Sequence, residues 1–213
     1  MFDFYGNGDV AWSYPGTDDE SRSTQAMADF MRNQYADVAA VVIGRRLFDL
    51  TNGWNGKPAA GEHVFVVTHE DPTDWEYAGT APFSFVDDVA KAIAAAREFV
   101  GDRDVDVAAG QIGSQALKLG LIDQVVLNVV PVVFGSGRPF FATGTLPEPL
   151  ELENPTTIVP GDRVTTWPST SGADAAGCTT GLKRSRGLLV PCFTQRRDRL
   201  RPAAGRVPRS CGR

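Results

Sequence analysis

Short apolar runs recur along the first 130 residues of the chain, and segments with helical periodicity lie between them. Five runs predict strands: 39–43, 64–67, 83–86, 105–109 and 125–130. Apolar residues spaced three and four positions apart predict helices over 24–35, 87–100 and 112–119. Strands that alternate with helices in this way predict an α/β fold, in which helices cover both faces of a mostly parallel sheet.

Polar residues and glycines mark the ends of these elements. Ser21 or Ser23 can cap the helix over 24–35, and Asp87 is predicted to cap the helix that ends before Gly101. Residues 1–20 are rich in glycine, aspartate and aromatic residues, which favours a loop. Beyond Gly135 the pattern changes, and the segments 150–152 and 163–165 are predicted to form antiparallel strands at the edge of the sheet.

The composition divides the chain into a domain over residues 1–168 and a tail over 169–213. The tail is dominated by Ser, Gly, Ala, Pro, Cys and Arg and has no sustained periodicity. Such a segment buries too little apolar surface to offset the entropy of ordering it, so we expect it to be disordered. A further hypothesis is that the tail is a frame-shifted read-out of a GC-rich gene, because the composition changes abruptly.

Charge is distributed unevenly between these two parts. Residues 178–213 contain ten Lys or Arg and one acid, a net of +9, and the total of −5 therefore leaves −14 for residues 1–177. A domain this acidic is not expected to bind nucleic acid, which needs clustered cations. The tail presents no face of aligned cations either, so we expect no nucleic-acid partner.

Other classes are poorly supported by the composition. No apolar stretch approaches the ~20 residues that span a bilayer, and no signal peptide is visible, so we expect a cytoplasmic protein with no membrane partner. The three cysteines, Cys178, Cys192 and Cys211, match no zinc pattern and are interpreted as reduced thiols. No metal-ligand cluster or nucleophilic triad is apparent, so no metal site is predicted and no catalytic residue is identified.

Three turns follow predicted parallel strands, where α/β proteins bind ligands. The first is Gly44, Arg45 and Arg46; the second is Thr68 and His69; the third is Ala109, Gly110, Gln111 and Ile112. Glycine permits close approach of a ligand, guanidinium groups suit phosphate, and a helix that begins after a glycine turn favours an anion. Taken singly, each turn is also compatible with a strand end or turn that binds no ligand, and spacing alone favours that interpretation for the first two.

A fourth segment follows the strand over 125–130. It includes Val133, Phe134 and Gly135, and it is either one wall of a substrate pocket or a simple turn.

Taken in order, four segments resemble the dihydrofolate reductase-like superfamily, in particular the branch related to the reductase domain of the riboflavin-pathway deaminase-reductase. They are 42–49 (VIGRRLFD), similar to the family's strand and Gly-Arg cofactor turn; 64–69 (VFVVTH), similar to its next strand; 107–111 (VAAGQ), similar to its Gly-Gly turn; and 120–137, similar to its stretch "G-L-I-D-E … P-V-x-x-G-x-G". The resemblance extends over about residues 1–166.

The resemblance implies a three-layer αβα sandwich that binds NADPH and forms a homodimer. The implied activity is hydride transfer to a small heterocyclic or ribosylated substrate, as in 5-amino-6-(5-phosphoribosylamino)uracil reductase of riboflavin biosynthesis or in dihydrofolate reductase. By resemblance, the residues at the adenosine phosphate end of NADPH are Gly44, Arg45, Arg46, Thr68 and His69. Those on its pyrophosphate and nicotinamide side are Ala109, Gly110, Gln111 and Ile112.

The chain also departs from the family pattern. The family's first strand is missing, so we expect Met1 to be an internal start of a longer protein. Leu47 stands where the family has a threonine, Ala109 stands for the first glycine of the Gly-Gly turn, and residues 166–168 (TWP) are expected to break the last strand. The missing first strand and Leu47 favour the alternative function, a catalytically inactive nucleotide-binding or dimerisation module with the same fold.

Overall fold

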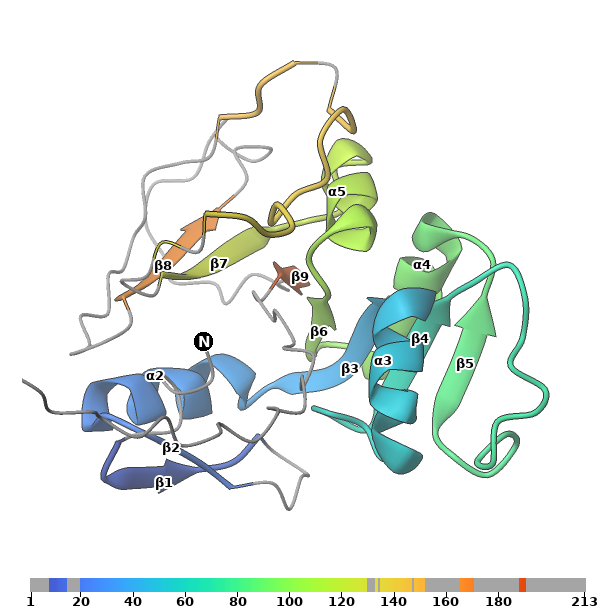
Figure 1. The fold of residues 1–213 in the computed structure, drawn as a ribbon, viewed down its shortest axis with the longest axis horizontal. Coiled ribbons are helices and arrows are strands. Elements are labelled where there is room, and N and C mark those ends of the chain that lie inside the picture. The colour runs from blue at the N-terminus through green and yellow to red at the C-terminus, as the bar shows by residue number, and fades with distance from the viewer. Residues whose placement is uncertain are drawn as a thin grey trace, which may run out of the picture.

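The computed structural model describes residues 8–14, 20–129, 133, 135–146, 148–151, 165–170 and 188–190, the last two ranges by their backbone alone. In chain order the elements are β1 (Val10–Trp12), β2 (Ser21–Ser23), α2 (Gln25–Tyr35), β3 (Val38–Gly44), α3 (Arg45–Asn55), β4 (His63–Val67), β5 (Phe83–Val86), α4 (Val89–Val100), β6 (Asp104–Val107), α5 (Gln111–Lys118), β7 (Gln124–Val129), β8 (Thr165–Thr170) and β9 (Leu188–Val190). Figure 1 shows their arrangement.

A seven-stranded sheet in the order β5-β4-β3-β6-β9-β7-β8 forms the centre of the fold. Neighbouring strands from β5 to β7 are parallel, and β8 pairs antiparallel with β7 at the edge. The expected α/β fold, with a mostly parallel sheet and an antiparallel C-terminal edge, is therefore confirmed.

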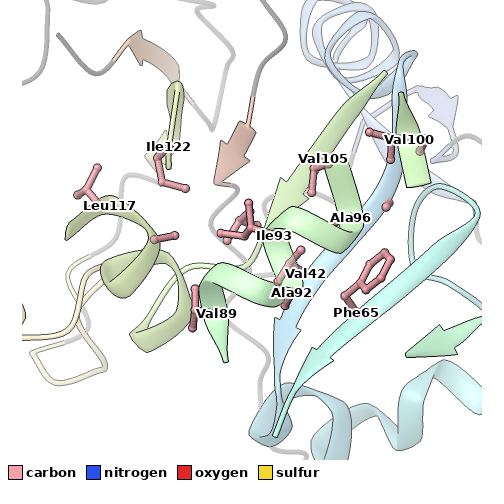
Figure 2. Packing of buried hydrophobic residues seen from close by; sticks show 14 of the residues in the cluster. Val42, Phe65, Val89, Ala92, Ile93, Ala96, Val100, Val105, Leu117 and Ile122 are labelled. Carbon is pink, nitrogen blue, oxygen red and sulfur yellow. The ribbon is translucent and has the colours of Figure 1, made fainter. Parts of the chain in front are cut away.

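Helices cover both faces of the sheet, as the contacts of alternate residues of β3 show. Val42 packs in one apolar cluster with α4 residues such as Ile93, whereas Val41 packs in a second cluster with Met27 of α2 and Phe48 of α3. Figure 2 shows the first cluster, in which α4 places Val89, Ala92, Ile93, Ala96 and Val100 against the strands. Since successive side chains of a strand point to opposite faces, this alternation produces three layers.

The predicted helix caps need correction by a few residues. The first helix is capped by Thr24, whose hydroxyl accepts from the amide of Met27, and not by Ser21 or Ser23, which lie in β2. Asp88 caps α4 by accepting from the amide of Lys91, whereas Asp87, the predicted cap, forms an ion pair with the Lys91 ammonium. Each cap is the residue directly before the first turn, from which a side chain can reach the free amides of that turn.

Three segments differ from the expected strands and loops. Residues 10–12 form β1, which pairs antiparallel with β2, although a loop was expected there. Helix α3 was not predicted. Leu150 and Glu151, the described part of the predicted strand 150–152, lie outside any strand.

The last predicted strand is not broken by residues 166–168, and that expectation was wrong. Strand β8 runs from Thr165 to Thr170, and Pro168 lies opposite Val126 of β7. Proline is tolerated there because β8 is an edge strand, so one side of its backbone needs no partner.

Two pieces of the tail lie among the described residues. Ser169 and Thr170 end β8, and Leu188–Val190 forms β9 between β6 and β7 (Figure 1), although disorder was expected for both pieces. Disorder of the rest of 169–213 stays a prediction, as does the boundary at residue 168. No helix within the described part of the chain is long and apolar enough to cross a bilayer.

Candidate functional site

The carboxyl ends of β4, β3 and β6 lie side by side. They form an edge of the sheet that runs across the strand ends, not along the edge strand β8. Gly44 at the end of β3 is opposite Val67 of β4, and Val42 is opposite Val107 of β6. The turns after these three strands therefore share one edge, as a common ligand site requires.

Contacts join the turns directly. A Cβ built on Gly44 would lie 3.0 Å from Cγ1 of Ile112, so the first turn of α5 packs over the end of β3. On the other side, Nη1 of Arg45 donates to Oγ1 of Thr68 at 3.4 Å and to the carbonyl of Glu70 at 2.7 Å. Gly44 and Arg45 thus connect the turn after β4 with the turn after β6.

Arg45 and Arg46 have different surroundings at the start of α3. The Nε of Arg45 forms an ion pair with Asp49 at 2.7 Å, one helical turn later. Arg46 is exposed, and no hydrogen bond or ion pair holds it within the described residues. Of the two guanidinium groups, that of Arg46 is therefore the freer to bind a phosphate.

Thr68 supports the loop, while His69 is exposed beside it. The Thr68 hydroxyl donates to the carbonyl of Glu70 at 2.9 Å and accepts from the amide of Glu70 at 3.2 Å. The hydroxyl proton of Thr68 is therefore already used in a hydrogen bond within the chain, so the hydroxyl does not donate to a phosphate oxygen. His69 lies close enough to Asp87 to contribute to lowering the pKa of that carboxyl, whose main cause is the hydrogen bond from Lys91.

The turn at Gly110 is held by a segment distant in sequence. The Gly110 amide donates to the carbonyl of Phe140 at 2.8 Å. The Ser114 hydroxyl donates to the carbonyl of Gly110 at 2.6 Å and accepts from the amide of Ala142 at 2.7 Å. The amide of Gly110 is therefore engaged, and the Ser114 amide donates to the carbonyl of Gly110, so the amides of Gln111, Ile112 and Gly113 are those that remain for an anion.

Helix α5 begins without a side-chain cap, in contrast to α4. Gly110 has φ +84° and no side chain to bond the first turn, and a Cβ built there would meet nothing within 4 Å. At the start of α4, by comparison, the carboxylate of Asp88 already occupies the N-terminus. Among the described residues, no side chain caps the positive end of α5, which lies at the edge that also carries Arg46.

The remaining predicted residues make fewer contacts with these turns. Ala109 is half-buried against the apolar cluster of α4, and Gln111 is exposed. Val133 is 96% exposed and Gly135 is exposed, so neither packs against the core, and Phe134 lies outside the described residues. A role of these three residues at the substrate stays a prediction.

The sequence analysis missed a buried acid next to this edge. Asp106 in the middle of β6 is 4% exposed, and its Oδ1 has no hydrogen-bond partner among the described groups. Burial raises the pKa of this carboxyl well above its usual value, and a hydrogen bond from the backbone of Val107 opposes that rise only in part. The signal in the sequence was an acid between two valines of a central strand. Within the described residues, no group of three or more His, Cys, Asp or Glu could hold a metal ion.

No protein-family model and no curated protein sequence matches the chain. Among solved structures, a match is a protein from Shewanella sp. PV-4 that carries the provisional name of riboflavin biosynthesis protein. The two share 24% identity and a TM-score of 0.50, over 63% of this chain and 75% of that one. A likeness at this identity shows the fold alone. The chain therefore shares the α/β fold of that protein, and this fold is consistent with the dihydrofolate reductase-like architecture expected from the sequence.

Proposed function

We propose that the chain is an NADPH-dependent reductase that transfers hydride to a small heterocyclic or ribosylated substrate, as in riboflavin biosynthesis. NADPH would bind across the edge formed by the turns after β3, β4 and β6. The cofactor supplies the hydride, and the protein's part is to hold it, orient it and exclude water. A homodimer and a cytoplasmic location belong to the same proposal.

One observation carries the proposal most directly: Arg46 and the uncapped start of α5 lie at the same edge of the sheet, with Gly44 packed beneath Ile112 between them. A dinucleotide has two anionic groups, and this edge offers a guanidinium for one and backbone amides for the other. At Gly110 an added Cβ would meet nothing within 4 Å, so a ligand can approach the backbone closely there.

Cofactor binding tests the proposal. NADPH titrated into the protein should show saturable binding by its fluorescence at micromolar concentrations. In Arg46→Ala the dissociation constant should rise by about tenfold, because a charge-assisted hydrogen bond is worth about 1.5–3 kcal/mol.

Arg103→Ala is the matched control. Arg103 lies just before β6, at the opposite edge of the sheet, where it pairs with Glu62. Its removal should leave NADPH affinity unchanged. Absence of binding to the wild-type protein, or equal loss in both variants, would reject the proposal.

A catalytically inactive nucleotide-binding or dimerisation module is the second candidate function. It is favoured by the Thr68 hydroxyl, which bonds within the chain, and by Leu47, which brings no hydroxyl to the site. The two functions separate on turnover: cofactor binding without NADPH oxidation, over a panel of pterins and ribosylaminopyrimidines, would support the module.

A further inference from the structure

The hydroxyl of Ser114 joins two segments that are distant in sequence. Ser114 is 1% exposed, and its hydroxyl donates to the carbonyl of Gly110 at 2.6 Å while it accepts from the amide of Ala142 at 2.7 Å. Two hydrogen bonds in a row polarise one another, so the bond from the Ala142 amide strengthens the one that Ser114 donates. The Gly110 carbonyl is therefore held firmly through this side chain.

The helix itself does not require this bond. The backbone amide of Ser114 already donates to the same Gly110 carbonyl at 3.0 Å, which is the ordinary bond between residues four apart in a helix. The hydroxyl supplies a second donor to that carbonyl. Its contribution is thus to the direction in which the Gly110 carbonyl points.

That direction also determines where the next amide points. The carbonyl of Gly110 and the amide of Gln111 belong to one planar peptide group, in which C=O and N–H point in opposite directions. Since the carbonyl is held towards the helix, the N–H of Gln111 points away from it. Gln111 is exposed, so a ligand can reach this residue from solvent.

Gly110 is a residue at which such a lock is needed. It has φ +84° and ψ −139°, a conformation that residues with a side chain rarely adopt. Glycine loses more conformational freedom on folding than other residues do, so its peptide groups reorient easily unless they are held.

The segment over 140–142 anchors the lock in the core. The Gly110 amide donates to the carbonyl of Phe140 at 2.8 Å, and Gly110 forms an isolated parallel bridge with Phe141. Both phenylalanines pack against the apolar cluster of α4, and their ring centroids are 4.7 Å apart. Ser114 therefore connects the turn to a segment that the core holds in place.

From this arrangement we infer that Ser114 is a positioning residue, which orients the Gln111 amide towards the diphosphate of the cofactor by holding the Gly110 carbonyl. The inference rests on the proposed function, which places an anion at the start of α5. Ser114 does not touch the ligand, because it is buried and its hydroxyl proton is used within the chain.

Three substitutions at position 114 test whether cofactor affinity follows the hydroxyl. Ser114→Ala lacks it, Ser114→Cys keeps a similar volume with a weaker donor, and Ser114→Thr keeps a hydroxyl that can bond the carbonyl four residues earlier. NADPH is titrated at a temperature well below the Tm of every variant. The dissociation constant should rise about fivefold or more in the Ala and Cys variants and stay within about twofold of wild type in the Thr variant.

Ser84→Ala is the matched control. The hydroxyl of Ser84 lies 2.9 Å from Nε2 of His63, on a strand that β4 and β3 separate from β6. Its loss should leave NADPH affinity unchanged. An equal loss of affinity in Ser84→Ala and Ser114→Ala, or in Ser114→Thr and Ser114→Ala, would overturn the inference.

Amide NMR separates a positioning role from a purely structural one. Addition of NADPH or inorganic pyrophosphate should move the Gln111 amide proton downfield in the wild-type protein and in Ser114→Thr. The shift should be much smaller in Ser114→Ala and Ser114→Cys. A lower Tm in these two variants, with unchanged affinity and an unchanged Gln111 shift, would show that Ser114 only stabilises the fold and would overturn the inference.

Pyrophosphate also distinguishes failure of the inference from failure of the proposed function. If NADPH binds but neither its affinity nor the Gln111 shift depends on Ser114, the inference fails and the proposed function stands. If the wild-type protein binds pyrophosphate at Gln111 but no NADPH, the proposed function fails, and the dependence of pyrophosphate binding on Ser114 decides the inference. If neither compound moves the Gln111 amide, the inference is overturned.

Discussion

Among the residues that the structure describes, Asp106 is the one whose carboxyl pKa is raised well above its ordinary value. Burial raises the pKa of its carboxyl well above the ordinary value of 3.8. A raised folded-state pKa means that the folded protein holds this proton more tightly than the unfolded chain. The contribution of this carboxyl to the free energy of unfolding is therefore greatest below about pH 3.8. It is lost as the pH rises through the folded-state pKa.

Asp106→Asn removes this titration and should flatten that part of the pH dependence. At pH 7 the variant should be more stable than the wild-type protein by about 1 kcal/mol or more, because no charge has to be buried. The difference should shrink as the pH falls towards 4. Denaturant unfolding at several pH values measures it, and a difference that does not vary with pH would contradict the assignment.

The arrangement of the turns could be predicted from the sequence, whereas the burial of Asp106 could not. The turns at Gly44 and Gly110 were predictable because each follows a clear apolar strand, and parallel strands bring their carboxyl ends together. An acid between two valines is typical of a strand with one solvated face, so this pattern alone did not show that Asp106 is buried. Its burial depends on the layer formed by Trp12 and α2, and residues 10–12 had been interpreted as a loop.

At the scale of elements, α3 is the one that the pattern did not reveal. Its final residues Asn52, Gly53 and Trp54 have left-handed backbone angles, so the right-handed part is too short for a recognisable period. The left-handed turn places Gly53 against an aromatic cluster, formed by Phe48, Trp75 and Phe83. Within it, Gly53 contacts Phe48 and Trp75. This arrangement depends on tertiary contacts, which local periodicity does not contain.

Gly53→Ala should therefore destabilise the protein strongly. Gly53 has φ +55°, and an added Cβ would lie 2.6 Å from Cζ2 of Trp75 and 2.8 Å from Cε2 of Phe48. Left-handed strain and overpacking together should cost about 2–4 kcal/mol, or about 5–15 °C in Tm.

Gly79→Ala is the matched control for that change. Gly79 also has a positive φ, +74°, but a Cβ there would meet nothing within 4 Å. Gly79→Ala should therefore lower the free energy of unfolding only by the cost of a left-handed backbone with a side chain, about 1–2 kcal/mol. Equal losses of Tm in the two variants would show that the aromatic cluster does not confine Gly53.

Over the whole molecule, the sheet depends on a strand far from its neighbours in sequence. β9 pairs with β6 through Leu188 and Leu189, and with β7 through Leu189 and Val190. It thereby joins the four parallel strands β5 to β6 with the β7–β8 pair. Composition could not predict this, because a three-residue apolar segment within an arginine-rich tail carries no periodicity of its own.

Two truncated chains test whether β9 holds the sheet together. A chain that ends at residue 187 lacks β9, which leaves the inner edges of β6 and β7 unpaired, and it should lose on the order of 2–4 kcal/mol. A chain that ends at residue 190 keeps the strand, and because residues 191–213 are expected to be disordered it should melt with the full-length protein. Differential scanning calorimetry compares the three chains. Equal Tm values for the chain ending at 187 and the full-length protein would show that β9 does not support the fold, and a low Tm for the chain ending at 190 would show that the final residues contribute to it.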